Sequence, residues 1–437
     1  MQALSLKRNA NFRWLVRGAI LSNLGDQLTL IAMPLLALQL TRDPFALGLL
    51  VALMGIPRAA FLLLGGAIVD RFSPQRVLLL SKLASAVLLA VMTLLVLNTR
   101  PVLTWTLGPL LSIAVHMTPQ LMLHALYCLA LLLGMAQAFG IPAATSIVPA
   151  ALPSPLLEAA NGILMGLRQL ALLAGPLIAG LLLGFSRHGL ALAFAIDGVS
   201  FLVSAWTLSK LALCPVPGRV APAQSVWRAL GEGLAMVWSD VPMRLCFLYW
   251  AIGALLLGGA MQVALPVLAT SSYQGSATLG WFLAAQGGGI LMGMAAGAVK
   301  ARRLAVFSFG STILLADGLA GLLVAPLGQV GSPWLAAALL LGSGTVSGFL
   351  QISIYTWIQR RVPAPMMGRA MSIFMFIFMG LAPLSALGAG WLLSWISAPR
   401  LFLAGGLGLA ALATAAYLFT PMRHIGRTQR AVRGPSA

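Results

Sequence analysis

The sequence predicts an all-α integral membrane protein whose twelve transmembrane helices form two six-helix, pseudo-symmetric halves. Hydrophobic residues make up 60% of the chain and charged residues only 8%, which is outside the range of soluble globular proteins. Apolar runs of about twenty residues recur along the chain, and ~20 helical residues cross a bilayer core of ~30 Å. The third observation is a sequence pattern that occurs once in each half of the chain.

Twelve apolar spans follow one another, and each is long enough to cross a bilayer. They cover residues 15–40, 47–69, 77–97, 119–143, 160–184, 190–213, 245–270, 277–299, 304–327, 334–358, 369–395 and 400–420. They predict four regions: an N-terminal six-helix half at 1–213, a cytoplasmic central connection at 214–244, a C-terminal six-helix half at 245–420 and a cytoplasmic tail at 421–437.

Two connections between the spans differ from simple loops. Segment 99–118 is apolar, but it contains two prolines and is short for a span, so we expect an interfacial or re-entrant excursion outside the membrane. In the central connection, apolar residues at helical spacing predict a helix on the cytoplasmic membrane surface; they are Trp227, Leu230, Leu234 and Trp238.

Lys and Arg residues set the orientation of the spans. When the N-terminus is placed in the cytoplasm, 22 of the 27 basic residues fall on the cytoplasmic side, as the positive-inside rule requires. This predicts a multi-pass protein of the plasma (inner) membrane with both termini cytoplasmic. The run Leu15–Leu40 is too long for a signal-peptide core, so we expect the first helix to be an uncleaved anchor.

The two halves share a pattern of small and polar residues. Met33-Pro34 and Gly48 correspond to Leu265-Pro266 and Gly280 at a shift of 232 residues. Farther along, residues 152–161 align with residues 362–371 at a shift of 210, and segment 99–118 accounts for the difference as an insertion. Two repeated six-helix halves predict a binding site between them near the midplane of the membrane.

Several stretches also resemble a known family: residues 11–15 (NFRWL), 65–72 (GGAIVDRF), 160–180 (ANGILMGLRQLALLAGPLIAG) and 359–369 (QRRVPAPMMGR). On these stretches the chain resembles transporters of the major facilitator superfamily. Within that family it is similar to the branch that contains the enterobactin exporter and the macrolide-efflux proteins.

The resemblance assigns a conformational latch to the turn between the second and third spans. The family motif is kept at Gly66, Asp70 and Arg71, and Arg76 is also present. The sequence departs from the motif at residues 73–75, which removes positive partners of the latch. In the second half the counterpart at 297–303 has no acidic residue, so a latch on Asp70 exists in one half only.

The fifth span follows the family's antiporter pattern. Gly162, Gly175, Pro176 and Gly180 are kept, whereas two other glycines of the pattern are replaced by alanine. The resemblance associates this pattern with export rather than uptake. Close packing of two helices through small residues explains the same pattern without any role in coupling.

Charged residues inside the spans are candidates for coupling, because each costs a few kcal/mol in a bilayer unless it is paired or hydrated. Asp26 and Arg58 both fall near mid-depth, so Asp26 is a candidate proton carrier tuned by Arg58. A static ion pair between the first two spans is the alternative. For Asp317 in the ninth span we expect a structural role. For Asp197 in the sixth span, a role in gating and a role in helix packing are both open.

Polar residues on several spans are candidates for lining an otherwise apolar chamber. They are Asn23, Gln137, Gln262, Gln286, Ser347, Gln351 and Tyr355. So few hydrogen-bonding groups suit a large amphipathic substrate better than a sugar. A polar stripe of Ser22, Asn23, Asp26 and Thr29 on the first span is expected to face the same chamber.

These features predict a secondary active exporter that exchanges amphipathic small molecules of drug, macrolide or siderophore type for protons by alternating access. A lipid or lysophospholipid flippase on the same fold is the alternative, and a non-transporting membrane receptor or scaffold ranks last. We expect a monomer in the lipid bilayer, with no enzymatic activity, metal, cofactor or nucleic-acid partner, since the scattered His, Cys and acidic residues form no catalytic or metal-ligand pattern.

Overall fold

The computed structural model describes residues 6, 8–41, 43–71, 73–97, 102–106, 112–116, 118–185, 188–212, 226–272, 276–300, 308–362 and 366–426. Two compact units make up the chain. The first comprises Met1–Ala223 and Gly275–Gly280, and the second comprises Gln224–Gln274 and Trp281–Ala437. The regions predicted from the sequence, with boundaries at 213, 244 and 420, stay predictions.

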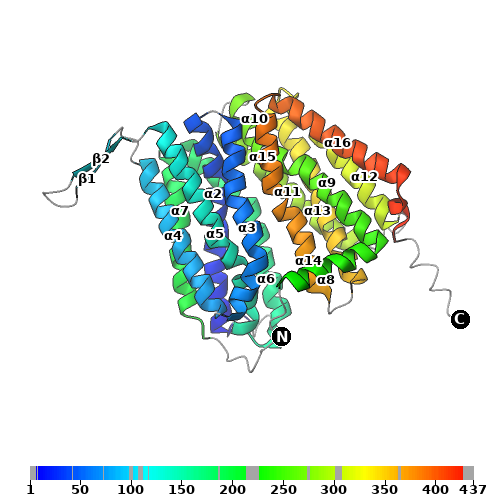
Figure 1. Ribbon diagram of the computed structural model, residues 1–437, viewed down its shortest axis with the longest axis horizontal. Helices are drawn as coiled ribbons and strands as arrows, with labels where there is room; N and C mark the ends of the chain where they lie inside the picture. Colours follow the sequence, from blue (N-terminus) through cyan, green and yellow to red (C-terminus); the bar gives the residue numbers. More distant parts are fainter. Residues whose placement is uncertain are drawn as a thin grey trace. The chain divides into compact units, whose positions relative to one another are not determined.

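The described residues of the first unit form six long helices, of which α2, α3, α4, α5 and α7 run side by side in Figure 1. Their bounds are α2 Ala10–Thr41, α3 Pro44–Arg71, α4 Pro74–Leu97, α5 Pro119–Ala151, α6 Leu157–Phe185 and α7 Gly189–Ser209, with a short 3₁₀ turn, η1, at Ser154–Leu156. The closest neighbours of α2 are α6 and α7, whereas α3 packs on α5 and α4 packs on both α5 and α7.

Helix starts in this unit follow from capping chemistry. Thr118 precedes Pro119, and its side chain accepts a hydrogen bond from the amide of Leu121 at 3.2 Å. Asp43 precedes Pro44, and its carboxylate accepts from the amide of Phe45 at 2.9 Å. Proline at the first helical position has its backbone angle already set and lacks an amide hydrogen that the helix could not use, so these sequences define where α5 and α3 begin.

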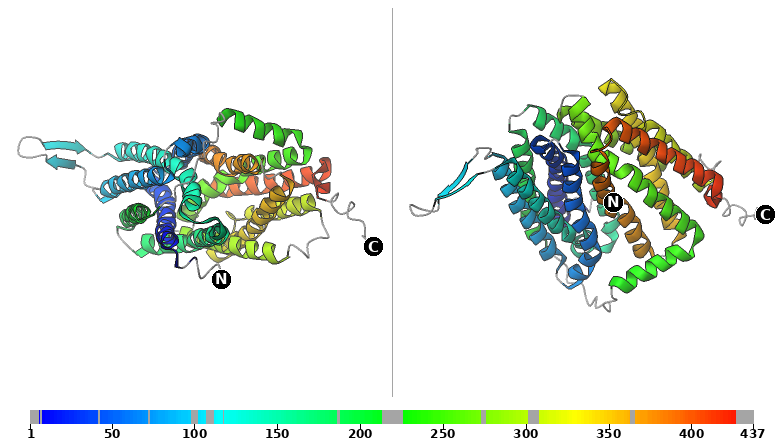
Figure 2. Two further views of the ribbon diagram at one scale, coloured as in Figure 1. Left: turned by 90° about the horizontal axis from the view of Figure 1, so that it is seen from below. Right: turned by 45° about the horizontal axis from the view of Figure 1, so that its top comes forward.

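Segment 99–118 contains a β-hairpin. Strands β1 (Val102–Thr106) and β2 (Ser112–His116) pair antiparallel, with Val102 opposite His116 and Thr106 opposite Ser112. Figure 2 shows the pair as two antiparallel arrows. The described residues of this segment, 102–106 and 112–116, thus form strands rather than a spanning helix, in agreement with the exclusion of the segment from the twelve spans, although the strand conformation was not predicted.

The second unit is also helical. Its elements are α8 Val226–Ser239, α9 Val241–Gly259, η2 Ala260–Ala264, α10 Leu265–Ser272, α11 Ser276–Lys300, α12 Phe309–Val324, α13 Pro333–Arg361, α14 Met367–Met375, η4 Phe376–Gly380, α15 Ala382–Leu392, α16 Ala398–Phe419 and η5 Pro421–His424. The start of α11, up to Gly280, belongs to the first unit. Both η2 and η4 are π-helical turns that interrupt longer helices. The helix expected in the central connection is present as α8.

Two helices of this unit cross at close backbone distance. A Cβ atom on Gly344 of α13 would overlap the carbonyl of Gln286, and one on Gly293 of α11 would overlap the carbonyl of Thr345. Only glycine permits such a close approach of two backbones. In lipid there is no hydrophobic driving force between helices, so the close van der Waals packing at these glycines stabilises their association.

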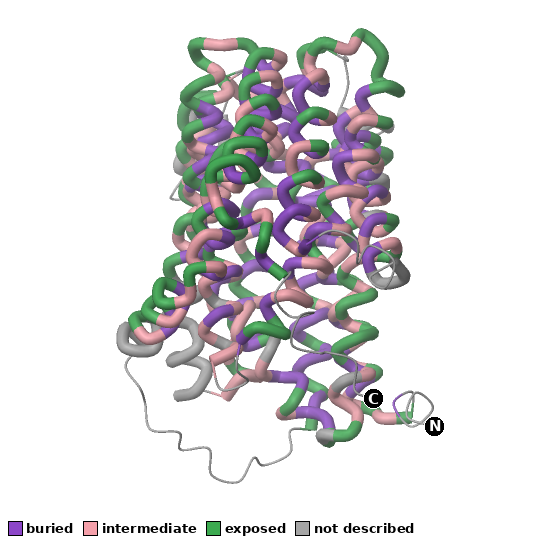
Figure 3. Tube along the Cα trace, turned by 90° about the vertical axis from the view of Figure 1, so that its right-hand side faces the viewer, coloured by how far each residue is buried: buried purple, intermediate pink, exposed green. Residues whose placement is uncertain are grey.

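In the described part of the chain, ten helical segments are long and apolar enough to cross a membrane. Two shorter apolar helical segments, Pro44–Ala60 and Phe309–Val324, coincide with the predicted spans 47–69 and 304–327. The class of the fold is thus confirmed, whereas the count of twelve is not. Along the helices that can be followed in Figure 3, buried and exposed residues alternate, as expected for helices that pack on one side and face lipid on the other.

Candidate functional site

Asp26 and Arg58 occupy the middle of two neighbouring helices. Asp26 lies about 24 Å from the start of α2 and about 22 Å from its end at ~1.5 Å per residue. Arg58 lies about 21 Å from the start of α3, directly after Pro57, which interrupts the helical hydrogen bonding. Both side chains are half-buried.

Three basic side chains on three helices interact electrostatically with the Asp26 carboxylate. Its charge interacts with those of Lys82 on α4, Arg58 on α3 and Arg168 on α6, in that order of strength. Asp26 is therefore not simply the partner of Arg58, as the sequence had suggested. Among these cations Lys82 has the strongest electrostatic effect on Asp26.

Lys82 is the residue of this cluster that the sequence reasoning missed. Its ammonium group donates a hydrogen bond to the Ser22 hydroxyl at 2.8 Å and lies 4.4 Å from the centre of the Phe201 ring. These contacts place it between α2 and α7, where a cation–π interaction and a hydrogen bond offset part of its desolvation. A single lysine inside the apolar run Val77–Leu97 could have indicated it.

Asp197 of α7 is completely buried and hydrogen-bonded. Thr29 donates to its Oδ2 at 2.5 Å, and Ser200 donates to its Oδ1 at 3.1 Å. The charge of Asp197 also interacts with those of Asp26 and Lys82. Of the two roles that the sequence left open for Asp197, gating and packing, its burial and its hydrogen bonds favour packing.

A glycine makes room for this carboxyl group. A Cβ atom on Gly25 of α2 would overlap Asp197 Oδ1 and Ser200 Oγ, so α2 and α7 approach closely at this level. The stripe on α2 consequently differs from expectation. Ser22 and Thr29 are buried against α4 and α7 and do not face a chamber, whereas Asn23 and Asp26 remain half-buried.

The residues of the antiporter pattern have unequal surroundings on α6. Gly162 is exposed, with nothing within 4 Å of a Cβ built on it. Gly175 packs on Gln27, the neighbour of Asp26, because a Cβ there would lie 2.5 Å from Gln27 Cγ. Gly280, which belongs to the first unit, lies against Gly180 and the carbonyl of Pro176 at 2.7 and 2.8 Å from its built Cβ. Close packing thus accounts for the second part of the pattern.

The candidate lining residues are spread over both units. In the first, Asn23 and Gln137 are half-buried on α2 and α5. In the second, Gln262 is exposed on η2, Gln286 is half-buried on α11, and Ser347 and Gln351 are exposed on α13. Ser347 donates to the Ser343 carbonyl at 2.9 Å, and Tyr355 turns its hydroxyl toward Met375 of α14 at 3.9 Å. Within the second unit, Tyr355 thus contacts α14.

The latch residues are only partly described. Helix α3 continues through Gly66 and Asp70 and ends at Arg71, and α4 begins at Pro74, so most of the stretch that the sequence suggested as a turn is helical. The side chains of Gly66, Asp70 and Arg71 lie outside the described residues, whereas Arg76 is exposed on α4.

Asp317 on α12 has an uncharged tyrosine as its neighbour, whereas Asp26 interacts with cations. Its carboxyl group is half-buried and interacts with the Tyr249 hydroxyl on α9, rather than with a group of cations as Asp26 does. This agrees with the structural role expected for Asp317 and makes it a useful counterpart to Asp26.

Comparison of the sequence with known proteins identifies the family of this chain. The family model described as Major Facilitator Superfamily matches residues 15–385. The enterobactin exporter EntS of Salmonella paratyphi A is 24% identical over 370 residues, covering 83% of this chain and 81% of the relative, and EntS of Escherichia coli O81 is 24% identical over 365 residues, covering 83% and 80%.

Solved structures agree in fold. A mutant of the nucleoside transporter NupG superposes with a TM-score of 0.69 at 15% identity, covering 92% of this chain and 98% of the other. A bacterial homologue of the iron transporter ferroportin, in its inward-facing state, gives 0.67 at 15% identity with the same coverage. With its family model, its helices and its relatives in agreement, the chain belongs to the major facilitator superfamily and is a multi-pass membrane transporter, not an enzyme.

Proposed function

We propose that this transporter exports an amphipathic small molecule of drug, macrolide or siderophore type in exchange for protons, by alternating access. Asp26 is the proton-binding carboxylate, and Arg58 and Lys82 tune its charge. The observation that carries the proposal is the position of Asp26 at the middle of α2 among cations from α3, α4 and α6. The exporter relatives support the direction of transport.

The physical basis is a change in charge balance inside the membrane. An isolated charge at the bilayer centre costs about 2.5–3.5 kcal/mol on insertion scales, so ionised Asp26 and its cations stabilise one another. A proton on Asp26 removes the shared negative charge, and the cations on three helices then repel one another. The helices that carry them are biased toward an arrangement in which the cations separate or meet an anionic group of the substrate.

The remaining assignments belong to the same proposal. Gly66, Asp70, Arg71 and Arg76 form a cytoplasmic latch, supported by the close succession of α3 and α4 at residues 71 and 74. The half-buried or exposed polar residues Asn23, Gln137, Gln262, Gln286, Ser347, Gln351 and Tyr355 line the substrate path. The protein works as a monomer in the inner membrane with both termini in the cytoplasm, which is supported by the distribution of Lys and Arg.

Proteoliposomes with an imposed pH gradient test the coupling residue. Enterobactin, erythromycin and a lysophospholipid serve as probes, after a thermal-stability screen has shown which of them binds. Asp26→Asn is expected to abolish gradient-driven accumulation while substrate exchange at equal pH on both sides continues, because the protein can still change conformation. Lys82→Gln should shift the pH dependence of transport, since Lys82 compensates Asp26.

Asp317→Asn is the matched control, because it changes a mid-helix carboxyl group whose neighbour is Tyr249. It should leave the pH dependence of transport unchanged. Accumulation against a gradient by the Asp26→Asn protein, with unaltered proton dependence, would refute the assignment of Asp26. Transport of the lysophospholipid that persists after the pH gradient is collapsed would replace proton-coupled export by lipid flipping.

A further inference from the structure

Helix α8 carries apolar residues on two opposite sides, which is unusual for a helix that connects two halves of a chain. One side packs on its own unit. Val237 is buried in the core of the second unit, and a Cβ on Gly233 would lie 3.1 Å from Arg369 Cβ and 3.3 Å from Ile373 Cδ1 of α14. This side explains why α8 is held against α14.

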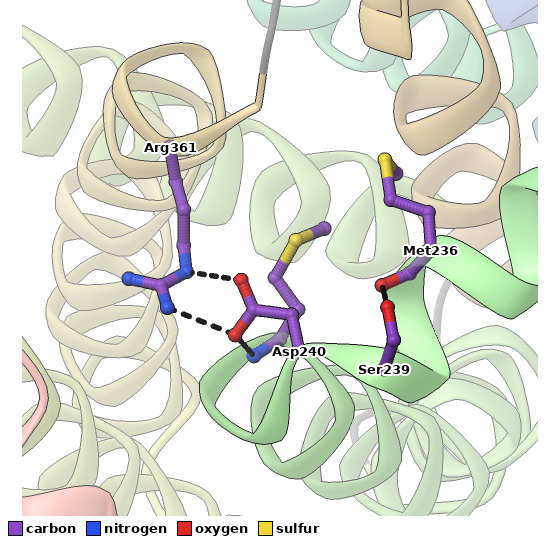
Figure 4. Close-up of polar contacts among 5 residues, drawn as sticks. Met236, Ser239, Asp240 and Arg361 are labelled. Atoms are coloured by element: carbon purple, nitrogen blue, oxygen red, sulfur yellow. Dashed lines mark hydrogen bonds and ion pairs between the residues drawn. The ribbon is translucent and has the colours of Figure 1, made fainter.

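One ion pair joins α8 to α14, and a second lies directly after the end of α8. Glu232 pairs with Arg369 Nη1 at 2.6 Å. Asp240, which caps α9, binds Arg361 of α13 through two parallel bonds of 2.7 and 2.8 Å, as Figure 4 shows. The positive charges of Arg361 and Arg369 are therefore already compensated by carboxylates.

The opposite side of α8 faces outward. Leu234 and Trp238 are 52% and 55% exposed. Together with Gly231 and Ala235 they line a shallow apolar groove that is largely open to its surroundings. Large apolar side chains exposed side by side indicate a surface that is covered in the working protein.

A cation lies at the end of this groove. The Arg244 guanidinium is 5.7 Å from the centre of the Trp238 ring, and its Nη1 donates to the Trp238 carbonyl at 3.4 Å. Its contacts are thus an aromatic face and a carbonyl oxygen, in contrast to the carboxylates bound by Arg361 and Arg369. Arg244 also lies in the first turn of α9, which begins a segment, Val241–Ser272, that is long and apolar enough to span a membrane. We therefore expect the start of α9, and the groove beside it, near the level of the headgroups.

We propose that the outward side of α8 is a binding site for an anionic phospholipid. One acyl chain lies in the groove along Leu234 and Trp238, and the lipid phosphate is bound by Arg244. Tryptophan at the level of the headgroups and an arginine available for phosphate are the two features that such a ligand requires. The site is independent of the coupling assigned to Asp26. A lipid bound there holds α8, the helix of the central connection, at the inner leaflet.

Native mass spectrometry of the purified full-length protein tests this site. The protein is titrated with phosphatidylglycerol and, separately, with phosphatidylcholine of the same acyl chains. Preferential binding of phosphatidylglycerol is expected, and Arg244→Gln should weaken it about fivefold, the usual effect of one basic residue at an anionic membrane surface. Arg400→Gln removes another exposed arginine that lies outside the site and should leave the affinity unchanged.

A second measurement locates the acyl chain. Phosphatidylglycerol with brominated chains should quench less fluorescence in Trp238→Phe than in the unaltered protein, and the difference should vanish in the Arg244→Gln background. Equal binding of the two lipids, or equal loss of binding in Arg244→Gln and Arg400→Gln, would overturn the proposal. So would competition by inorganic phosphate alone, or a change from dimer to monomer in Leu234→Gln, which would assign the surface to a second copy of the chain.

Discussion

The hydrogen bond between Thr29 and Asp197 predicts a measurable loss of stability when it is removed. Thr29→Val keeps the shape of the side chain and replaces its donor by a methyl group. Both residues are buried, with 2% and 0% of their surface exposed, and the donor–acceptor distance is 2.5 Å. Ser200 binds the other carboxyl oxygen, so Oδ2 loses the donor that Thr29 supplies.

The expected magnitude follows from these contacts. Hydrogen bonds between membrane helices are worth about 0.6 kcal/mol on average and up to about 1.7 kcal/mol. Leaving a buried acceptor unsatisfied costs about 1–3 kcal/mol, and a methyl group this close to Oδ2 must also move away. We therefore expect a loss of about 1–2 kcal/mol, which corresponds to a factor of about 5–30 in the unfolding equilibrium.

Unfolding of the detergent-solubilised protein by sodium dodecyl sulfate, followed by circular dichroism, measures this free energy. Thr207→Val is the matched control, because Thr207 is equally buried at 2% but bonds only the Ser204 carbonyl of its own helix, at 2.8 Å. In an Asp197→Leu background the effect of Thr29→Val should disappear, because there is no carboxyl group left to satisfy. Equal costs for Thr29→Val and Thr207→Val would refute the reasoning.

Two further predictions concern close packing and surface charge. Gly25→Ala should cost about 1–3 kcal/mol of unfolding free energy, because the new Cβ would overlap Asp197 and Ser200. Gly162→Ala, on the open face of α6, is the control and should change the unfolding free energy by less than about 0.5 kcal/mol. Equal effects of the two substitutions in the same unfolding assay would contradict the close approach of α2 and α7. Arg361→Gln should cost only about 0.2–1 kcal/mol, because the Arg361 and Asp240 side chains are 32% and 26% exposed, and the difference from the unaltered protein should shrink at 1 M salt. A salt-independent loss above this range would show that the pair is not screened by solvent.

Part of the candidate site was open to prediction from the sequence, because depth along a helix depends only on residue number. Counting ~1.5 Å per residue places Asp26 and Arg58 at mid-helix, and α2 and α3 have bounds that agree with this. The surface helix of the central connection was also predictable, since its spacing of apolar residues is visible without any partner. Its outward side became apparent only after α14 was seen to cover the other side.

The neighbours of Asp26 could not be predicted in the same way. Lys82 is 56 residues away from Asp26 in sequence, and Asp197 is 171 residues away. The sequence does not indicate which faces of α2, α4 and α7 contact one another. Ser22 and Thr29 were expected to face a chamber because they are polar, but they bind Lys82 and Asp197 inside the unit.

By itself, the sequence determined the membrane class, the family and the position of Asp26 and Arg58 along their helices, because hydrophobic length, motif residues and helical rise are properties of consecutive residues. The tertiary structure alone decided which charges share one site, because that depends on how helices rotate and approach. Gly25 illustrates the reason: without a side chain there, α2 and α7 come close enough for Thr29 to bind Asp197. The cluster around Asp26 is a product of helix packing.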